Sequence, residues 1–415
     1  MDALVFRTLH RLIKKGTLRL TTAKGVARSF GGGDGLTVAV RFRTARAQRR
    51  VLLDPELRLG EAFVDGDLII EQGTITQLLE LLLSQDQKGT APITTKMLAG
   101  LRFVLRRLAQ KNGRRRSRRN VAHHYDLSGK LYELFLDRDM QYSCACFENM
   151  DMSLDEAQQA KKRHIAAKLL PGRHARVLDI GCGWGGLALY LAEAFDAHVT
   201  GITLSTEQLE FARARAAAAS DPARLEFRSQ DYRDVNERFD RIVSVGMFEH
   251  VGVNHYDEFF RQRRDLLDDE GVFVLHSIGR SDPPGFTNPW IARYIFPGGY
   301  IPALSEVLPA IERAGLVVTD VEILRLHYAE TLRHWRKRFL ARRTEAIDLF
   351  DERFARLWEY YLSVSELAFR HQGMMVFQIQ IARRQDAVPL TRGYIEREER
   401  RLQAVSTTKP ECERA

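Results

Sequence analysis

The sequence contains few cysteines and no long apolar segment. Only four of its 415 residues are cysteine, too few for a disulfide framework, and Cys144 and Cys146 stand too close together for a common zinc motif. No apolar run approaches the roughly 18 residues that a helix needs to cross a bilayer. The first residues also lack the apolar core and cleavage site of an export signal. We therefore expect a cytoplasmic protein with reduced cysteines and without a metal site.

Positive charge is in excess, which indicates an anionic partner or surface. Lys and Arg number 63 against 54 Asp and Glu, for a formal net charge of +9. The arginine run at 113–119 has no apolar spacing, so we interpret residues 111–122 as a basic linker, either solvated or in contact with phosphates. Basic amphipathic stretches at 4–15 and 97–108 favour an anionic membrane surface, although each apolar face could instead fill a domain core.

Residues 1–110 are predicted to form a small α+β domain of their own. Strand-like runs occur at 37–43 and 49–53, a turn between strands at 60–70, and a leucine-rich helix at 74–83. We expect this N-terminal domain to be accessory to the rest of the chain and to bind lipid.

From about residue 123 the chain alternates strand and helix patterns, which predicts a catalytic domain over 123–385. Helical segments separate the first five predicted strands, so these strands should run parallel with right-handed crossovers. The predicted fold class is therefore α/β, with a seven-stranded, mostly parallel, doubly wound Rossmann-like sheet. Residues 330–371 are predicted to be helical, and 386–415 to form a charged tail. The strands are predicted at 177–180, 198–205, 225–232, 239–245, 271–278, 316–324 and 374–382.

The stretch Val177–Gly186 is the most informative in the chain. An apolar strand passes Asp179, turns through Gly181 and Gly183, and leads into an Ala- and Leu-rich helix. Glycines at these positions let the backbone approach a ligand, which the N–H groups of the following helix face. A Gly-x-Gly-x-Gly turn alone is a weak signal. A strand before it, a helix after it and a second strand about 20 residues later make a nucleotide-type pocket the favoured interpretation.

Polar residues at the other strand ends narrow the choice of ligand. In an open parallel sheet the ligand lies beyond the carboxyl ends of the strands. A nicotinamide cofactor would favour an acid at the end of the second strand, where Thr203 and Ser205 stand instead, and Gln230 and Asp231 end the third. This arrangement favours S-adenosylmethionine, which has no pyrophosphate.

Together these motifs resemble those of the cyclopropane-fatty-acyl-phospholipid synthase family over roughly residues 120–385. The sequence departs from the family at Ser128–Lys130, where a Gly/Ser-Asn-Asp/Glu run is usual, and at Cys146, where an aromatic residue is usual. The matching segments are His124–Leu127, Met140–Ala145, Val177–Gly186, Gln230–Tyr232, Ser244–Gly252, Leu275–Gly279 and Tyr294–Gly299.

The resemblance implies an enzyme that transfers a methylene group from S-adenosylmethionine to the cis double bond of an unsaturated membrane phospholipid, closing a cyclopropane ring. It also implies peripheral binding to the inner face of the plasma membrane, and a homodimer is compatible with it. The predicted cofactor contacts are Tyr142, Ser143, Asp179, Gly181, Gly183, Thr203, Gln208, Gln230 and Asp231.

The implied reaction also needs a base. Attack by an alkene on the methyl group leaves a carbocation, and ring closure then requires the removal of a proton. The resemblance implies that bound bicarbonate is this base. The residues that would hold bicarbonate are Cys144, Glu249, His276, the backbone of Ile278, and Tyr328.

Three other functions compete with this one. A C-methyltransferase that makes methyl- or methylene-branched acyl chains without ring closure would share nearly every motif, so the sequence leaves this alternative open. A nucleic-acid methyltransferase is disfavoured, because Asp282–Gly285 follows the fifth strand and lacks the aromatic residue that stacks a flipped base. A lipid-binding module without catalysis is disfavoured by the intact set of Cys144, Glu249 and His276.

Overall fold

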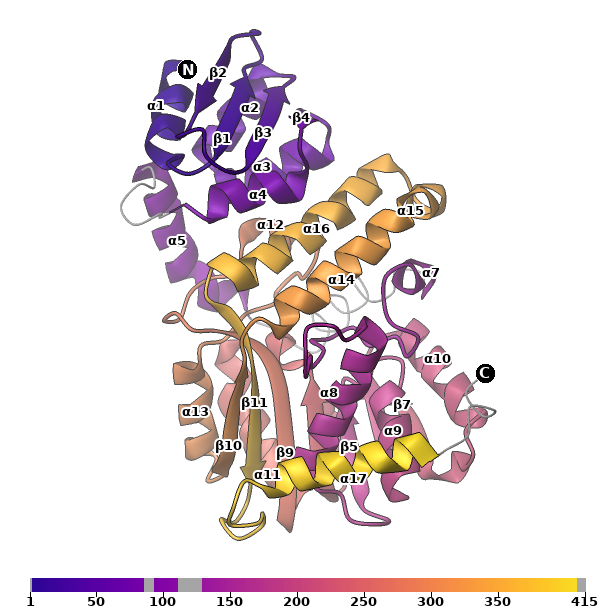
Figure 1. The fold of residues 1–415 in the computed structure, drawn as a ribbon. Helices are drawn as coiled ribbons and strands as arrows, with labels where there is room; N and C mark the ends of the chain where they lie inside the picture. The colour runs from indigo at the N-terminus through magenta and orange to yellow at the C-terminus, as the bar shows by residue number, and fades with distance from the viewer. Residues whose placement is uncertain (1, 86–92, 111–128, 409–415) are drawn as a thin grey trace. The chain divides into compact units, whose positions relative to one another are not determined.

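The computed structural model describes residues 2–85, 93–110 and 129–408 (Figure 1). The predicted basic linker at 111–122 and the motif His124–Leu127 lie outside the described residues, and so does Cys412.

The chain forms two compact units, and each unit is assembled from separated segments. The predicted 123–385 domain is divided between them, because two of its segments pack with the N-terminal residues. The first unit holds Met1–Ala109, Gly285–Pro297 and Leu332–Met374, and the second holds Gln110–Pro284, Gly298–Thr331 and Met375–Ala415.

The first unit is built on a small sheet with the strand order β2-β1-β3-β4. β1 (Thr17–Thr21) runs antiparallel to β2 (Ala27–Phe30) and parallel to β3 (Thr37–Phe42), and β3 runs antiparallel to β4 (Leu68–Gln72). Alternate residues of β1 and β3 are buried, as expected for strands with one face on a core. The helices are α1 (Asp2–Leu12), α2 (Ala45–Leu53), α3 (Pro55–Val64), α4 (Ile75–Leu83), α5 (Ile93–Ala109), α12 (Pro289–Tyr294), α15 (Arg343–Leu349), α16 (Glu352–His371) and most of α14 (His327–Ala341).

Late segments of the chain complete this first unit. α16 packs against α3 and α4. Trp290 on α12 meets Tyr360 on α16 edge to face, with ring centroids 4.6 Å apart. Gly60 on α3 makes this contact possible, since a Cβ there would come to 2.5 Å of Trp290 and 2.6 Å of Tyr360.

Two N-terminal predictions are wrong. Residues 49–53, predicted as a strand, belong to α2, whose first turn is capped by Thr44: its hydroxyl accepts a hydrogen bond from Ala47 N at 3.2 Å. Residues 60–70, predicted as a turn between strands, contain the end of α3 and the start of β4, and α3 begins at Pro55. Apolar runs this short fit both periodicities, and the capping residues decide between them.

The second unit contains a seven-stranded sheet with the order β10-β11-β9-β8-β5-β6-β7. The pairs β7–β6, β6–β5, β5–β8 and β8–β9 are parallel, whereas β10 and β11 are antiparallel. All seven predicted strands are present, which confirms the Rossmann-like α/β fold. They are β5 (Arg176–Ile180), β6 (His198–Thr203), β7 (Leu225–Ser229), β8 (Phe239–Val245), β9 (Leu267–Arg280), β10 (Val317–Leu324) and β11 (Met374–Ala382).

Helices cover both faces of this sheet (Figure 1). Neighbouring residues of β9 show the two-sided burial, because Phe273 and Val274 belong to different core clusters. The carboxyl ends of the central strands are thereby left as the place for a ligand. The α-helices are α7 (Gly129–Glu133), α8 (Leu154–Leu169), α9 (Gly186–Phe195), α10 (Thr206–Ala217), α11 (Tyr256–Leu266), α13 (Leu304–Arg313) and α17 (Tyr394–Thr408), and the short 3₁₀ helices are η1 (Pro222–Arg224), η2 (Tyr232–Asp234), η3 (Phe248–His250) and η4 (Val253–His255).

The segment predicted as a charged tail contains a packed helix. α17 lies against α8 and buries Tyr394, Ile395 and Leu402. The predicted helical stretch at 330–371 is confirmed and consists of α14, α15 and α16. In the ranges that the structure describes, no helix is both long and apolar enough to cross a membrane.

Candidate functional site

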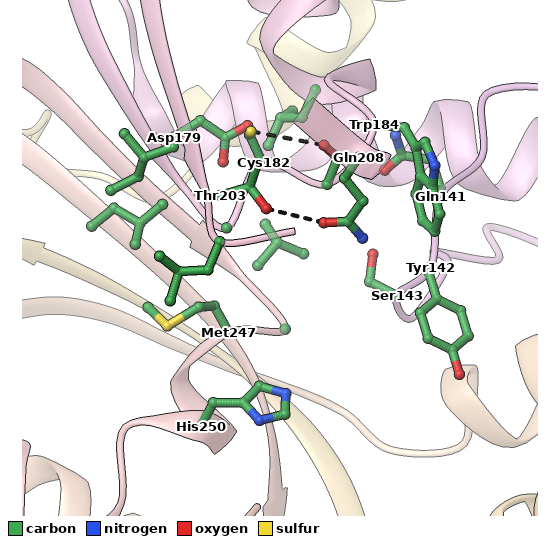
Figure 2. A pocket seen from close by; sticks show the side chains of 18 of the residues that line it. Gln141, Tyr142, Ser143, Asp179, Cys182, Trp184, Thr203, Gln208, Met247 and His250 are labelled. Atoms are coloured by element: carbon green, nitrogen blue, oxygen red, sulfur yellow. Dashed lines mark hydrogen bonds between the residues drawn. The ribbon is translucent and has the colours of Figure 1, made fainter. Parts of the chain in front are cut away.

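A pocket lies at the carboxyl ends of the central strands of the second unit (Figure 2). With its open mouth it encloses about 1080 Å³. Every predicted cofactor contact except Asp231 lines it. The predicted residues that line the pocket are Tyr142, Ser143, Asp179, Gly181, Gly183, Thr203, Gln208 and Gln230.

The glycine turn after β5 forms one wall of the pocket. Gly181 and Gly183 have φ values of +79° and +55°, in the left-handed region that favours glycine. A Cβ on Gly183 would meet nothing within 4 Å, so this residue faces open space. The N–H groups of Gly181 and Cys182 both donate to the carbonyl of Ile202, at 2.9 and 3.1 Å, which ties the turn to β6.

The end of β6 fixes the Gln208 side chain. Ser205 caps α10 by accepting a hydrogen bond from Gln208 N at 3.3 Å. The Thr203 hydroxyl donates to Gln208 Oε1 at 3.1 Å, as Figure 2 shows. The amide oxygen is therefore engaged, and the amide NH₂ group is the part of Gln208 left to contact a ligand.

Asp231 lies beside the pocket lining and has a partner within the protein. Its side chain caps η2 and forms an ion pair with Arg233 at 2.7 Å. The carboxylate is thus neutralised beside the pocket, while its neighbours Gln230 and Tyr232 line the cavity. Contact between Asp231 and a cofactor remains a prediction.

The segment that carries Tyr142 and Ser143 is fastened to α8. Gln158 Nε2 donates to the carbonyls of Gln141 and Ser143, at 3.2 and 3.0 Å. Lys162 Nζ contacts the Asp139 carboxylate at 2.6 Å. These bonds join one helix to alternate residues of the segment, so Tyr142 and Ser143 are held in position at the pocket.

None of the predicted catalytic residues is part of the pocket lining, but Cys144, Glu249 and His276 lie next to residues that are. Glu249 precedes the lining residue His250, and His276 pairs with the lining residue Val245 across β8 and β9. Glu249 Oε1 accepts a hydrogen bond from Ile278 N at 2.6 Å. The N–H of Ile278 is therefore committed to Glu249, and Ile278 positions this carboxyl.

Burial makes Glu249 an unusual acid. It raises the pKa of Glu249 to about 7, and the Ile278 hydrogen bond opposes the rise. Glu249 Oε2 is buried and has no hydrogen-bond partner in the described part of the chain. This oxygen is free to accept from a ligand, or to donate to one when the carboxyl is protonated.

Gln378 on β11 fixes the tautomer of His276. Lys168 Nζ, which can only donate, contacts Gln378 Oε1 at 2.9 Å, so Gln378 Nε2 is the atom that lies 3.1 Å from His276 Nδ1. Burial lowers the pKa of His276 well below its usual value, so the ring is neutral. Because Nδ1 accepts from Gln378, the ring hydrogen is on Nε2, and His276 offers a donor there.

Hydrogen bonds join the residues that follow Cys144 to the start of α14, which carries Tyr328. Ala145 N donates to Thr331 Oγ1, and Phe147 N to His327 Nδ1, both at 3.0 Å, so the start of α14 is bonded to the residues that follow Cys144. Burial raises the pKa of the Cys144 thiol well above its usual value, so the group is a neutral thiol. The catalytic roles of Cys144, Glu249, His276, Ile278 and Tyr328 remain a prediction.

Sequence reasoning missed Lys161, His250 and Met247 in the lining, and Gln378 behind it. Gln378 and Gln380 do give a signal, since they interrupt the otherwise apolar strand Met374–Ala382 at alternate positions. Lys161 gives none, because a lysine on a polar helix is usually solvated.

Comparison with known proteins places the chain in a family. Residues 112–379 match the profile of a family described as mycolic acid cyclopropane synthetase. The chain belongs to this family. Within the cyclopropane synthetase family, the cyclopropane-fatty-acyl-phospholipid synthase of Escherichia coli (strain K12) is 38% identical over 344 residues, 83% of this chain and 87% of that one. The tuberculostearic acid methyltransferase UfaA1 of Mycobacterium tuberculosis is 35% identical over 396 residues, 92% of this chain and 91% of that one.

A solved structure shows the likeness in the fold as well. The crystal structure of mycolic acid cyclopropane synthase CmaA1 complexed with SAH and CTAB has 35% sequence identity and a TM-score of 0.61, and the likeness covers 64% of this chain and 97% of that one. SAH is the product that S-adenosylmethionine leaves after methyl transfer. The 415-residue chain, as a member of the cyclopropane synthetase family, is therefore an enzyme of the S-adenosylmethionine-dependent methyltransferase class.

Proposed function

We propose that the protein transfers a methylene group from S-adenosylmethionine to the cis double bond of an unsaturated phospholipid acyl chain and closes a cyclopropane ring. The observation that carries this proposal is the similarity to the Escherichia coli cyclopropane-fatty-acyl-phospholipid synthase over most of both chains. In this proposal residues 123–385 provide the catalytic machinery and residues 1–110 gather lipid.

The pocket fits the cosubstrate. Its glycine turn faces open space at Gly183, and Asp179 brings a buried carboxyl oxygen without a hydrogen-bond partner among the described residues. A ligand that carries positive charge would satisfy this oxygen, and S-adenosylmethionine carries both an ammonium and a sulfonium group.

The proposed base is a bicarbonate ion, which would take the proton that the new methyl group loses as the ring closes. His276 Nε2–H would donate to one of its oxygens, and Glu249 Oε2 would accept its hydroxyl hydrogen. The Tyr328 hydroxyl would supply a further donor. The Cys144 thiol donates to the carbonyl of Ala145 at 3.3 Å, so Cys144 would contribute through its backbone N–H. Neither His276 nor Cys144 is charged, so this cradle holds an anion by oriented dipoles.

A second candidate is methyl branching without ring closure. The similarity to a tuberculostearic acid methyltransferase over nine-tenths of both chains favours it nearly as strongly. The two reactions share the first step and differ in how the carbocation is quenched. The position of the base is therefore the feature that would separate them.

We also propose that the protein is cytoplasmic and docks peripherally on an anionic bilayer through α5. Met97, Leu101, Val104 and Leu105 project from one face of this helix and are 44% to 72% exposed. The helix sequence contains Lys96, Arg102, Arg106 and Arg107 and no acidic residue, although Arg102 is paired with Asp54 and Glu56, at 2.7 and 2.8 Å. Exposed apolar side chains with basic residues on one helix are typical of helices that lie in an anionic bilayer surface.

Product analysis tests the reaction. The protein is incubated with S-adenosylmethionine and vesicles of a cis-monounsaturated phospholipid, and the acyl chains are examined by proton NMR, with saturated vesicles as the control. Upfield ring-methylene signals support cyclopropanation. Methyl-branch signals would replace it with the second candidate, and an unchanged alkene would contradict both.

Vesicle sedimentation tests the docking surface. Val104→Glu should lower the fraction bound to anionic vesicles several-fold, and added salt should lower it further. Leu390→Glu is the matched control, since Leu390 is a fully exposed apolar residue of the second unit. Equal binding by Val104→Glu and the unmodified protein would contradict the α5 assignment. Light scattering of the protein without vesicles would decide whether it is a homodimer.

A further inference from the structure

Lys161 is a buried cation in the wall of the cofactor pocket, and the chemistry proposed above does not use it. It lies on α8 and is only 1% exposed. Its Nζ donates to Gln141 Oε1 at 2.5 Å and to Ser143 Oγ at 2.9 Å, and both neutral partners line the pocket as well. An ammonium has three N–H donors, and no acceptor for the third occurs within the described ranges.

Asp179 brings the opposite charge to the same pocket. It stands near the end of β5, and its Oδ2 is enclosed without a hydrogen-bond partner in the described residues. Burial raises the pKa of Asp179 to about 7, and burial lowers the pKa of Lys161 to about 8. Lys161 is the charged group that opposes the rise at Asp179, yet it makes no direct bond to Oδ2.

Holding the protein segment in place does not account for Lys161. Gln158 already binds the carbonyls of Gln141 and Ser143, and Lys162 already binds the Asp139 carboxylate. The carboxylates of Asp137 and Asp139 favour the charged form of Lys161 through space, but neither is a hydrogen-bond or ion-pair partner of its Nζ. A neutral side chain could fill the remaining position without the cost of burying an ammonium whose direct partners are neutral. A buried ammonium that contacts only neutral protein groups and lines a ligand pocket indicates a negative charge on the ligand.

We infer that Lys161 binds the carboxylate, and Asp179 the ammonium, of the amino-acid end of S-adenosylmethionine. These two groups sit on one carbon of the ligand and carry opposite charges, which matches a pocket with one buried cation and one buried carboxyl. The inference rests on the proposed cosubstrate and names the residues that hold one end of it. Lys161 would thereby distinguish S-adenosylmethionine and its product from nucleosides that lack the amino-acid end.

Three ligands separate the contributions of the two charges. S-adenosylhomocysteine carries both groups, its decarboxylated analogue carries only the ammonium, and 5′-methylthioadenosine carries neither. Titration calorimetry on the full chain should show that Lys161→Met weakens binding of S-adenosylhomocysteine roughly 10- to 100-fold, the usual range for a lost charge-assisted hydrogen bond. Binding of the other two ligands should stay within about twofold. Asp179→Asn should weaken S-adenosylhomocysteine and the decarboxylated analogue and spare 5′-methylthioadenosine.

Lys162→Met is the matched control, because Lys162 is also a buried α8 lysine but binds Asp139 and does not line the pocket. It should change the affinity for all three ligands by one common factor. The same uniform loss in Lys161→Met would overturn the inference and make Lys161 a structural residue. If Lys161→Met does not fold, Lys161→Gln provides the same comparison. In the unmodified protein, removal of the ligand carboxylate must itself lower the binding affinity at least about tenfold. No lipid is present in these titrations, so they can fail while the lipid reaction stands.

Discussion

Lys161 and Lys168 lie two turns apart on the same face of α8, and both are fully buried, yet their surroundings differ. Lys168 is in contact with the carboxylates of Glu322 and Asp320 and with the Gln378 amide oxygen. Lys161 touches only neutral oxygens. The lysine among carboxylates completes an internal network, whereas the lysine among neutral groups leaves its charge for a ligand. Burial and residue type alone therefore do not reveal function, and the partners of the charge do.

The largest expected effect is a difference in unfolding free energy between variants of these two lysines. Lys168→Met should lower the free energy of unfolding by about 3 kcal/mol, because Glu322 and Asp320 lose their fully buried cation. Among the described residues, these carboxylates then keep only His164 and the half-exposed Arg392 as partners. Lys161→Met should change it by less than about 1 kcal/mol, since no carboxylate loses a direct partner. Urea unfolding of both variants measures the two values, and equal losses would remove the distinction between the two lysines.

Glu249 resembles Lys161 rather than Lys168, because its buried Oε2 has no hydrogen-bond partner among the described residues and is available to a ligand. Glu249→Gln preserves the acceptor for Ile278 N but removes the ionisable oxygen, so turnover should fall about 100-fold, as for loss of a group that takes part in proton transfer. Affinity for S-adenosylhomocysteine should not change, because Glu249 does not line the pocket. Steady-state kinetics and calorimetry check the two parts, and full turnover in Glu249→Gln would exclude a catalytic role.

Gln378 connects the Lys168 network to His276. Gln378→Met should lower turnover about tenfold, since His276 Nδ1 loses the donor that places its hydrogen on Nε2. Gln380→Met is the control, because Gln380 is a buried glutamine of the same strand that binds the Lys168 carbonyl and makes no contact with His276. If both variants lose turnover equally, the effect is one of folding and the assigned tautomer has no catalytic consequence.

The smallest effect is a pH dependence of stability in the same network. Burial lowers the pKa of His164, but hydrogen bonds to Glu322 on β10 and Glu399 on α17 outweigh burial and raise it overall, against the opposing charge of Lys168. A raised pKa in the folded state contributes stability that is complete below the unfolded value of about 6.5 and is lost as pH rises through the folded value. His164→Gln should therefore flatten the decline in unfolding free energy above about pH 6.5. If the unfolding free energy of His164→Gln declines as steeply as that of the unmodified protein, groups other than His164 cause the decline.

The sequence predicts those parts of the molecule whose signals are local. The strand, glycine turn and helix at Val177–Gly186 are fixed by residues next to one another, and their order and the lining position of Gly181 are confirmed. The strand predicted at 49–53 is wrong because a cap at Thr44 outweighs a short apolar pattern. Lys161 could not be predicted, since α8 has the composition of a polar helix and is buried only when residues 139–143, β8, β9 and α17 pack against it.

The interleaving of the two units has a consequence for synthesis. α16 completes the first unit and β11 and α17 complete the second, so both wait for residues beyond about 350 to leave the ribosome. A nascent chain stopped before that point would expose the faces of α3 and α4 that α16 covers, together with an incomplete sheet in the second unit, and exposed apolar surface of this kind leads to aggregation. We expect this chain to reach its native state after translation, with both halves closing late and nearly together, although the first strands of each emerge far apart in time.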